Sequence, residues 1–242
     1  MSASATRTAL LAVLLATGAA AAAPDGTPAA APQADQEPAP KLTQAQQLVF
    51  ANDLMQKVPA GSVPEYRFTR HGKDLPDYQD RVIVTVTRVA DDGKRDLQFD
   101  FLSGGHHLDF QPATAYRGNP VPIQFLERDI KELAAATEGA SGYFRNRLRA
   151  AFAKAQSEPV KIPLGGQEVP GVRITLKPFA GDPNSARFKD YADKGYEFLF
   201  SEQVPGGLYQ ISTRVPSAGS DAPLIEEQLT FHHRNPDTPI AH

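Results

Sequence analysis

Two pairs of adjacent histidines are the first side chains in this sequence that could do chemistry. His106 and His107 are followed by Asp109, and His232 is followed by His233. Neighbouring side chains of an extended strand point to opposite faces, so neither pair can bind one ion through both rings. A metal site would need His107 and Asp109 to meet a third ligand such as His233. Surface histidines are far commoner, so we expect no metal or other cofactor and keep these three residues only as candidate ligands.

A run of charged residues offers the second candidate chemistry. Glu127, Arg128, Asp129, Lys131 and Glu132 follow one another closely. On a helix, Glu127 and Lys131 are four residues apart, as are Arg128 and Glu132, which predicts two simple ion pairs. Catalysis would need two carboxylates facing each other across a cleft. We favour a structural role, with Asp129 partly buried beside the apolar stripe of the helix.

Basic residues follow in the next helical segment. Arg145 and Arg149 are one turn apart, and Arg147 and Lys154 lie nearby. This basic edge could meet anionic lipid headgroups or the acidic residues of the preceding helix. The second interpretation is favoured. Glu227 is unusual because strand alternation places it inward, where it should pair with an arginine or lie at the rim of a sheet.

The motifs of the common hydrolases and nucleotide-binding proteins are missing from the sequence. It contains no Gly-x-Ser-x-Gly, no His-Glu-x-x-His and no phosphate-binding loop. It also contains no cysteine, which excludes disulfides, thiolate catalysis and a lipid-modified N-terminal cysteine. We therefore predict no catalytic residue. A non-enzymatic function is favoured over an unrecognised hydrolase that uses His and Asp or Glu.

Three amphipathic helices must position these side chains. The first is expected to be capped by Thr43 and to run to about Lys57. A second should have Pro122 in its first turn, carry apolar residues at steps of three and four, and end at Gly139. A third should be capped by Ser141 and form a helical hairpin with the second. Each has one apolar stripe, which predicts that all three lie against a sheet.

Alternating apolar and polar residues indicate strands on both sides of the helical hairpin. An Asp-Gly turn at 91–94 and a Pro-Gly turn at 204–207 join neighbouring strands, the second with the residues of a type II turn. We predict about seven or more antiparallel strands with one wet and one buried face. The clearest segments are 81–89, 97–101, 172–177, 196–200, 209–215 and 225–231.

The N-terminal residues have the order of a secretory signal. Arg7 precedes a short apolar run and then small residues, so we expect cleavage after Ala22. Residues 23–41 are rich in Pro and Ala and should be a disordered tether. A single domain is expected over 42–233 and an irregular tail over 234–242. With no lipidated cysteine, the predicted location is the periplasm, with no transmembrane segment in the mature chain.

Charge argues against a nucleic-acid partner. The full chain has a net charge of −3, and removal of Arg7 with the signal would make it −4. The basic residues are scattered along the chain, which is not typical of nucleic-acid-binding proteins.

The element order resembles a known superfamily. An N-terminal helix, antiparallel strands, an inserted helix pair and further strands look like the half-barrel of the LolA/LolB lipoprotein carriers. The stretches 125–130 and 201–207 are similar to segments of uncharacterised exported proteobacterial proteins. The expected fold is therefore α+β, a curved antiparallel half-barrel sheet covered by the N-terminal helix and the helical hairpin.

The resemblance implies a function as well. It suggests a periplasmic carrier that shelters a lipid or acyl chain between sheet and helices, without catalysis. The residues expected to line this site are Phe99, Phe101, Ile130, Phe144, Phe198, Arg145 and Arg149. Two alternatives remain open: an envelope structural or assembly protein with a filled core that binds a partner protein, and the unrecognised hydrolase.

Overall fold

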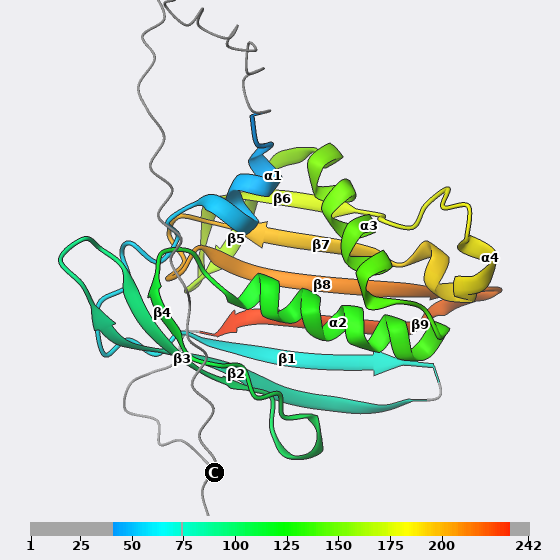
Figure 1. The fold of residues 1–242 in the computed structure, drawn as a ribbon, viewed down its shortest axis with the longest axis horizontal. Helices are drawn as coiled ribbons and strands as arrows, with labels where there is room; N and C mark the ends of the chain where they lie inside the picture. Colours follow the sequence, from blue (N-terminus) through cyan, green and yellow to red (C-terminus); the bar gives the residue numbers. More distant parts are fainter. Residues whose placement is uncertain (1–40, 74, 233–242) are drawn as a thin grey trace, which may run out of the picture. The chain divides into compact units, whose positions relative to one another are not determined.

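The computed structural model describes residues 41–73 and 75–232 as one nine-stranded antiparallel sheet with four α-helices (Figure 1). The spatial order of the strands is β4-β3-β2-β1-β9-β8-β7-β6-β5. Strands β4 and β5 are the two edges, so the sheet is open and does not close into a barrel. The predicted α+β class and antiparallel sheet are confirmed. The strand bounds are β1 Glu65–Gly72, β2 Leu75–Val89, β3 Arg95–Phe101, β4 Ala113–Tyr116, β5 Ser157–Leu164, β6 Gln167–Leu176, β7 Gly195–Phe200, β8 Leu208–Ser217 and β9 Ser220–His232.

The helical hairpin connects the two halves of the sheet. Helix α2 (Val121–Thr137) and helix α3 (Ser141–Lys154) follow β4 and precede β5, and they lie across one face of the sheet (Figure 1). Pro122 lies in the first turn of α2, as predicted, and Glu138 ends that helix in the left-handed conformation with a φ of 53°. The residue before α3 is Ala140, and Ser141 is its first helical residue, so the prediction that Ser141 caps this helix is wrong.

The N-terminal helix is shorter than predicted. Thr43 caps α1 (Gln44–Gln46) through a complete capping box with Gln46, and the helix continues as a π-helical segment, Gln47–Ala51. It ends there, six residues before Lys57, because Asn52 is extended and turns follow. Met55 and Val58, whose apolar side chains continue the helical spacing of this segment, are buried from these turns instead.

The inner face of the sheet and the helices share one hydrophobic core. Alternate residues of the central strands point into it, among them Tyr66 and Phe68 of β1 and Phe198 and Phe200 of β7. The predicted type II turn is confirmed: Gly206 has a φ of 78°, and the amide of Gly207 donates to the carbonyl of Val204 at 2.8 Å. Strands β1, β4 and β5 and the short helix α4 (Ser185–Phe188) were not predicted.

Candidate functional site

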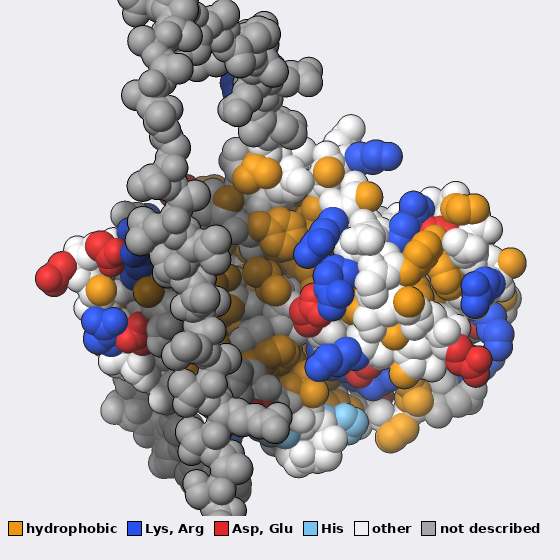
Figure 2. Space-filling view, viewed as in Figure 1, with side chains coloured by type: hydrophobic (Ala, Val, Ile, Leu, Met, Phe, Trp, Pro, Cys, Tyr) orange, Lys and Arg blue, Asp and Glu red, His pale blue; other side chains and the backbone are white. Residues whose placement is uncertain are grey.

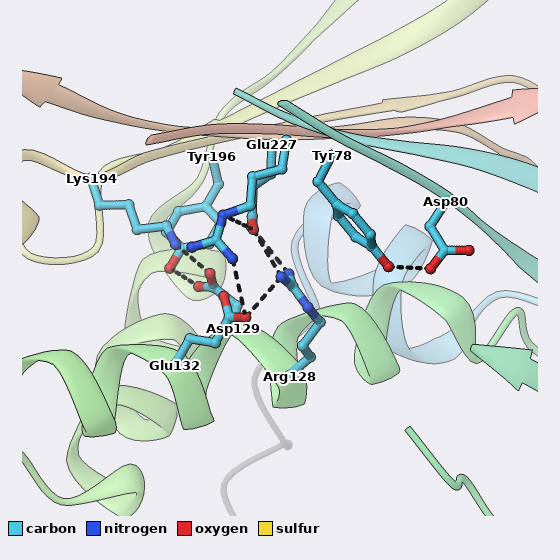
Figure 3. A network of polar contacts seen from close by, with 9 residues as sticks. Tyr78, Asp80, Arg128, Asp129, Glu132, Lys194, Tyr196 and Glu227 are labelled. Carbon is cyan, nitrogen blue, oxygen red and sulfur yellow. Dashed lines mark hydrogen bonds and ion pairs between the residues drawn. The ribbon is translucent and has the colours of Figure 1, made fainter. Parts of the chain in front are cut away.

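Helix α2 turns a charged surface toward the sheet. Arg128 and Asp129 are buried on this inner side, and Glu132 follows one turn after Arg128. Figure 3 shows them facing Lys194, Tyr196 and Glu227, which come from the sheet and the segment just before β7. The charged residues of α2 therefore belong to the helix–sheet interface.

Glu227 and Arg128 form the centre of this network. The guanidinium of Arg128 donates to both carboxylate oxygens of Glu227, at 2.8 and 3.1 Å. It also donates to Glu132 at 2.8 Å, which confirms the predicted i,i+4 pair. The Nε atom of Arg70 on β1 lies 3.6 Å from a carboxylate oxygen of Glu227. The prediction that Glu227 points inward and pairs with an arginine is confirmed.

Asp129 forms the second half of the network. It is fully buried and binds the ammonium of Lys194 and the hydroxyl of Tyr196, the latter at 2.5 Å. Over the whole network, the number of positive side chains equals the number of negative ones. The cations are Arg70, Arg128 and Lys194, and the anions are Asp129, Glu132 and Glu227. A buried charge is tolerated when it is paired and hydrogen-bonded. This cluster satisfies both conditions, which gives Asp129 the structural role expected of it.

The environment shifts the pKa values of the two glutamates in opposite directions. Burial alone would raise the pKa of Glu227, but hydrogen bonds and charge from Arg128 outweigh it and hold that pKa below its usual range. Partial desolvation raises the pKa of Glu132, and Glu227 and Asp129 add to this by repulsion, although Arg128 opposes it. Burial, followed by the charge of Asp129, raises the pKa of Tyr196 far above that of a free phenol. Tyr196 is therefore a hydrogen-bond donor in this site.

Three carboxylates of this network lie close enough together to be compared with a metal site. Oxygens of Asp129, Glu132 and Glu227 lie within 4.8 Å of one another, and this is the one such cluster of acidic and histidine side chains in residues 41–73 and 75–232. Each of these carboxylates already faces Arg128 or Lys194. An added cation would have to displace these side chains, so the arrangement fits an ion-pair network better than a metal centre.

A second feature lies on the outer side of the helices, where α2 and α3 diverge. A groove of about 380 Å³ runs between them. Its floor is apolar and consists of side chains from both helices and from the N-terminal helical segment: Phe50, Ile123, Leu126, Ile130, Leu148 and Phe152. Its volume lies in the range of small-molecule sites, about 300–1,000 Å³. The groove can therefore hold an apolar ligand.

The rim of this groove is polar and partly basic. Arg145 binds the carboxylate of Glu127 through two hydrogen bonds of 2.8 and 2.6 Å, which lowers the pKa of Glu127. Arg145 thus meets an acid of α2, as predicted, and Glu127 pairs with it rather than with Lys131. Arg149 is exposed at the rim and has no ion pair within the described residues. It leaves one cation available at the mouth of the groove.

The seven residues expected to bind a ligand lie in two places. Ile130, Arg145 and Arg149 line the groove between α2 and α3. Phe101, Phe144 and Phe198 are buried in the core, and Phe99 is half-buried against it. The edge contact of Phe144 with Phe179, at 5.6 Å between centroids, is typical of packed core rings. Whether any of the seven binds a ligand stays a prediction.

The histidine candidates do not assemble in the described residues. The Nδ1 atom of His107 lies 3.0 Å from the carbonyl oxygen of Leu102, and Asp109 is exposed in the following loop. Neither belongs to the acidic cluster above. His233 lies outside the described residues.

Several residues of the network were missed by the sequence reading. Lys194 lies in a segment with no clear periodicity, and Arg70 belongs to the unpredicted strand β1. Asn119 was also missed; its amide donates to Tyr66 and to the carbonyl of Gly206, and its oxygen accepts from the amide of Val121. Asn119 therefore ties the start of α2 to β1 and to the 204–207 turn. A polar residue just before a proline and a helix was the available signal for it.

Comparisons with known proteins add little. No protein-family model matches the sequence, and no curated protein matches it. Among solved structures, the chain is similar to the lipoprotein LppX of Mycobacterium tuberculosis, with 12% sequence identity and a TM-score of 0.32, over 78% of this chain and 94% of LppX. A likeness at this level carries no weight for fold or ligand. In residues 41–73 and 75–232, no helix is both long and apolar enough to cross a membrane.

Proposed function

We propose that the protein is a non-catalytic binding module for an apolar or lipidic ligand, and that the ligand occupies the groove between α2 and α3. The groove itself is the observation that carries this proposal: its floor is apolar and its volume is about 380 Å³. Residues 1–22 support an exported protein that acts in the periplasm, as expected above. The single domain over 42–233 and the preceding tether are part of the same proposal.

The proposed site differs from the one that the resemblance implied. Between sheet and helices, Phe101, Phe144 and Phe198 have 1% or less of their surface exposed and fill the core. An acyl chain would have to displace them to enter. The groove between the helices needs no such displacement, because its space is already present in the structure. Ile123 at its surface is only half-buried and can contact a ligand there.

A neutral apolar dye tests the proposal directly. Full-length protein should bind N-phenylnaphthylamine with a saturable rise in fluorescence that long-chain fatty acid reverses. Ile123→Glu places a carboxylate in the groove and should weaken dye binding by at least about tenfold, because a charge is costly to bury beside an apolar ligand. Val89→Glu is the matched control, since Val89 is an exposed apolar residue on β2 away from the groove. Equal dye affinity in both variants would overturn the groove as the site.

The filled core favours a second candidate function. An envelope structural or assembly protein would bind a partner protein through its surface and would need no internal cavity, which agrees with the packing of Phe101, Phe144 and Phe198. Native mass spectrometry of protein purified from the envelope separates the two. Co-purified lipid supports the binding module. A ligand-free protein that also fails to bind the dye, but retains a partner in a pull-down, supports the second function.

A further inference from the structure

Helix α3 is the most basic of the helices and strands that the structure describes. Its fourteen residues include Arg145, Arg147, Arg149 and Lys154 and no acidic residue. The full chain has a net charge of −3, so this surface departs strongly from the average. Figure 2 shows Lys and Arg side chains gathered over the position of α3, with hydrophobic side chains beside them.

Exposed apolar side chains adjoin this basic helix. Leu42 and Phe50 each have 47% of their surface exposed and are among the four most exposed large apolar residues in the described chain. The ring of Phe50 packs edge-on against Phe152 of α3, with centroids 5.1 Å apart. Thr43 donates to the carbonyl of Phe152 at 3.0 Å. These contacts fix the apolar residues against the last turns of α3.

A cationic cleft lies on the other side of the same helix. It has a volume of about 580 Å³, and its charged lining residues are Arg147, Lys154, Arg173, Lys177 and Glu158. Two of the cations are engaged: Arg147 pairs with Asp182, and Arg173 pairs with Glu158 and Glu197. Lys154 and Lys177 have no ion pair in the part of the chain that the structure describes. They are available to an external anion.

We propose that Leu42, Phe50, Arg149, Lys154 and Lys177 form a docking surface, the α3 surface, for a bilayer that contains anionic phospholipid. Lysines and arginines near such a bilayer are attracted to its headgroups, and exposed aromatic and aliphatic residues insert at the boundary with the acyl chains. A partner protein with an acidic patch is the other candidate occupant, and in that case the chain would not bind protein-free vesicles. The apolar groove between α2 and α3 opens beside the same surface, through Phe50 and Arg149.

Vesicle co-sedimentation of the full chain tests the docking surface. The protein should bind vesicles of phosphatidylcholine and phosphatidylglycerol in equal parts and should not bind phosphatidylcholine alone. Binding should weaken as salt is raised, because salt screens exposed charges. Failure to bind the anionic vesicles at low salt would overturn the proposal.

Neutralising variants locate the interaction. The double variant Arg149→Gln, Lys154→Gln should lower vesicle affinity about 25-fold, since each cation near an anionic bilayer contributes about fivefold. Arg67→Gln, Arg88→Gln removes the same charge from exposed strand positions on β1 and β2 and should leave affinity unchanged. Equal losses in the two double variants would show that net charge alone drives binding and would overturn the α3 surface.

The apolar part has its own readout. Phe50→Ser, Leu42→Ser should reduce binding to the anionic vesicles even at low salt, because apolar insertion is not screened by ions. Unchanged vesicle affinity in this variant would show that Leu42 and Phe50 do not take part in docking. Vesicle binding and dye binding without vesicles are both measured for Lys154→Gln, Lys177→Gln, which removes two cations of the α3 surface that do not line the ligand groove. Retained dye binding with lost vesicle binding separates the docking surface from the ligand groove, so either can fail alone.

Discussion

Glu226 and Glu227 are neighbours on β9 with opposite environments. Glu226 faces outward and pairs with Arg214 at 2.7 Å, and its side chain is 44% exposed. Glu227 faces the core, is 1% exposed and holds Arg128. The same carboxyl group is therefore a solvated surface charge at one position and part of a buried pair at the next.

Replacement of these two glutamates should have very different effects on stability. Glu227→Gln leaves Arg128 buried without its main counter-charge and should reduce the free energy of unfolding by about 3–5 kcal/mol. Glu226→Gln removes a solvent-exposed pair and should cost less than about 1 kcal/mol. Urea denaturation at neutral pH measures both. Similar losses in the two variants would contradict the buried network.

The pH dependence of stability should follow from the same group. The pKa of Glu227 in the folded protein lies below its usual value of 4.5, so its contribution is present above that value and is lost as the pH falls through the folded pKa. Glu132 has the opposite sign: its folded pKa is raised, so it favours the folded state only while protonated and loses that contribution as the pH rises through it. Glu132 should therefore take up a proton before Glu227 on acidification.

Denaturation midpoints at several pH values check this assignment. The free energy of unfolding of the parent protein should fall steeply below about pH 4.5. That fall should be shallower in Glu227→Gln, because the carboxylate whose protonation destabilises the parent is already absent. In Glu132→Gln the free energy of unfolding should fall with decreasing pH as it does in the parent protein. A parent-like slope in Glu227→Gln would show that other carboxylates control the acid limb.

Two glycines, one in a strand and one in a helix, differ in the space available for a side chain. A Cβ atom on Gly171 of β6 would lie 2.2 Å from the side chain of Ile162 and 2.8 Å from the carbonyl oxygen of Phe200. A Cβ atom on Gly142, in the first turn of α3, would meet no atom within 4 Å. The first glycine is required by close strand packing, and the second is not.

Alanine substitution should therefore stabilise one element and disrupt the other. Gly171→Ala should reduce the free energy of unfolding by about 1–3 kcal/mol, through strain against backbone that cannot move away. Gly142→Ala should raise it by about 0.5–1 kcal/mol, because alanine loses less entropy in a helix. Chemical denaturation of both variants provides the measurement. Destabilisation by Gly142→Ala would show that α3 begins differently.

The two helices of the hairpin could be predicted because their apolar residues repeat over several turns. The predicted length of the N-terminal helix was too great because Met55 and Val58 continue its apolar spacing. In the structure these two side chains are buried from the turns that follow the helix. Strand β5 was missed because Pro159 and Pro163 interrupt its alternation. The network was only half predictable: Glu227 stood out as an inward carboxylate, but Lys194 comes from a turn, and no local pattern places it beside Asp129.

At the scale of the whole molecule, an open sheet has two free edges. The free edge of β5 contains Pro159 and Pro163, which lack the N–H donor that a further strand would need. The other edge, β4, has only four residues. These features protect the sheet from pairing with another copy of the chain.

Removal of the prolines should therefore promote association. Pro159→Val, Pro163→Val restores a continuous row of donors on β5 and should shift sedimentation at high protein concentration toward dimers or larger species. Pro112→Val, in an exposed loop, is the control for added apolar surface and should remain unchanged. An unaltered sedimentation profile for the double variant would show that the prolines do not guard this edge.

The position of β9 in the sheet has a consequence for how the chain acquires its structure. The last described strand lies in the interior of the sheet, where it pairs with β1 on one side and with β8 on the other and so joins β1–β4 to β5–β8 by strand pairing. Until residues 220–232 are available, strands β1–β4 and strands β5–β8 cannot pair into one sheet, and Arg128 has no Glu227 to bind. Such distant pairings are slow to form. A chain whose residues become available from the N-terminus onward can therefore complete this nine-stranded order only after β9 has been added between β1 and β8.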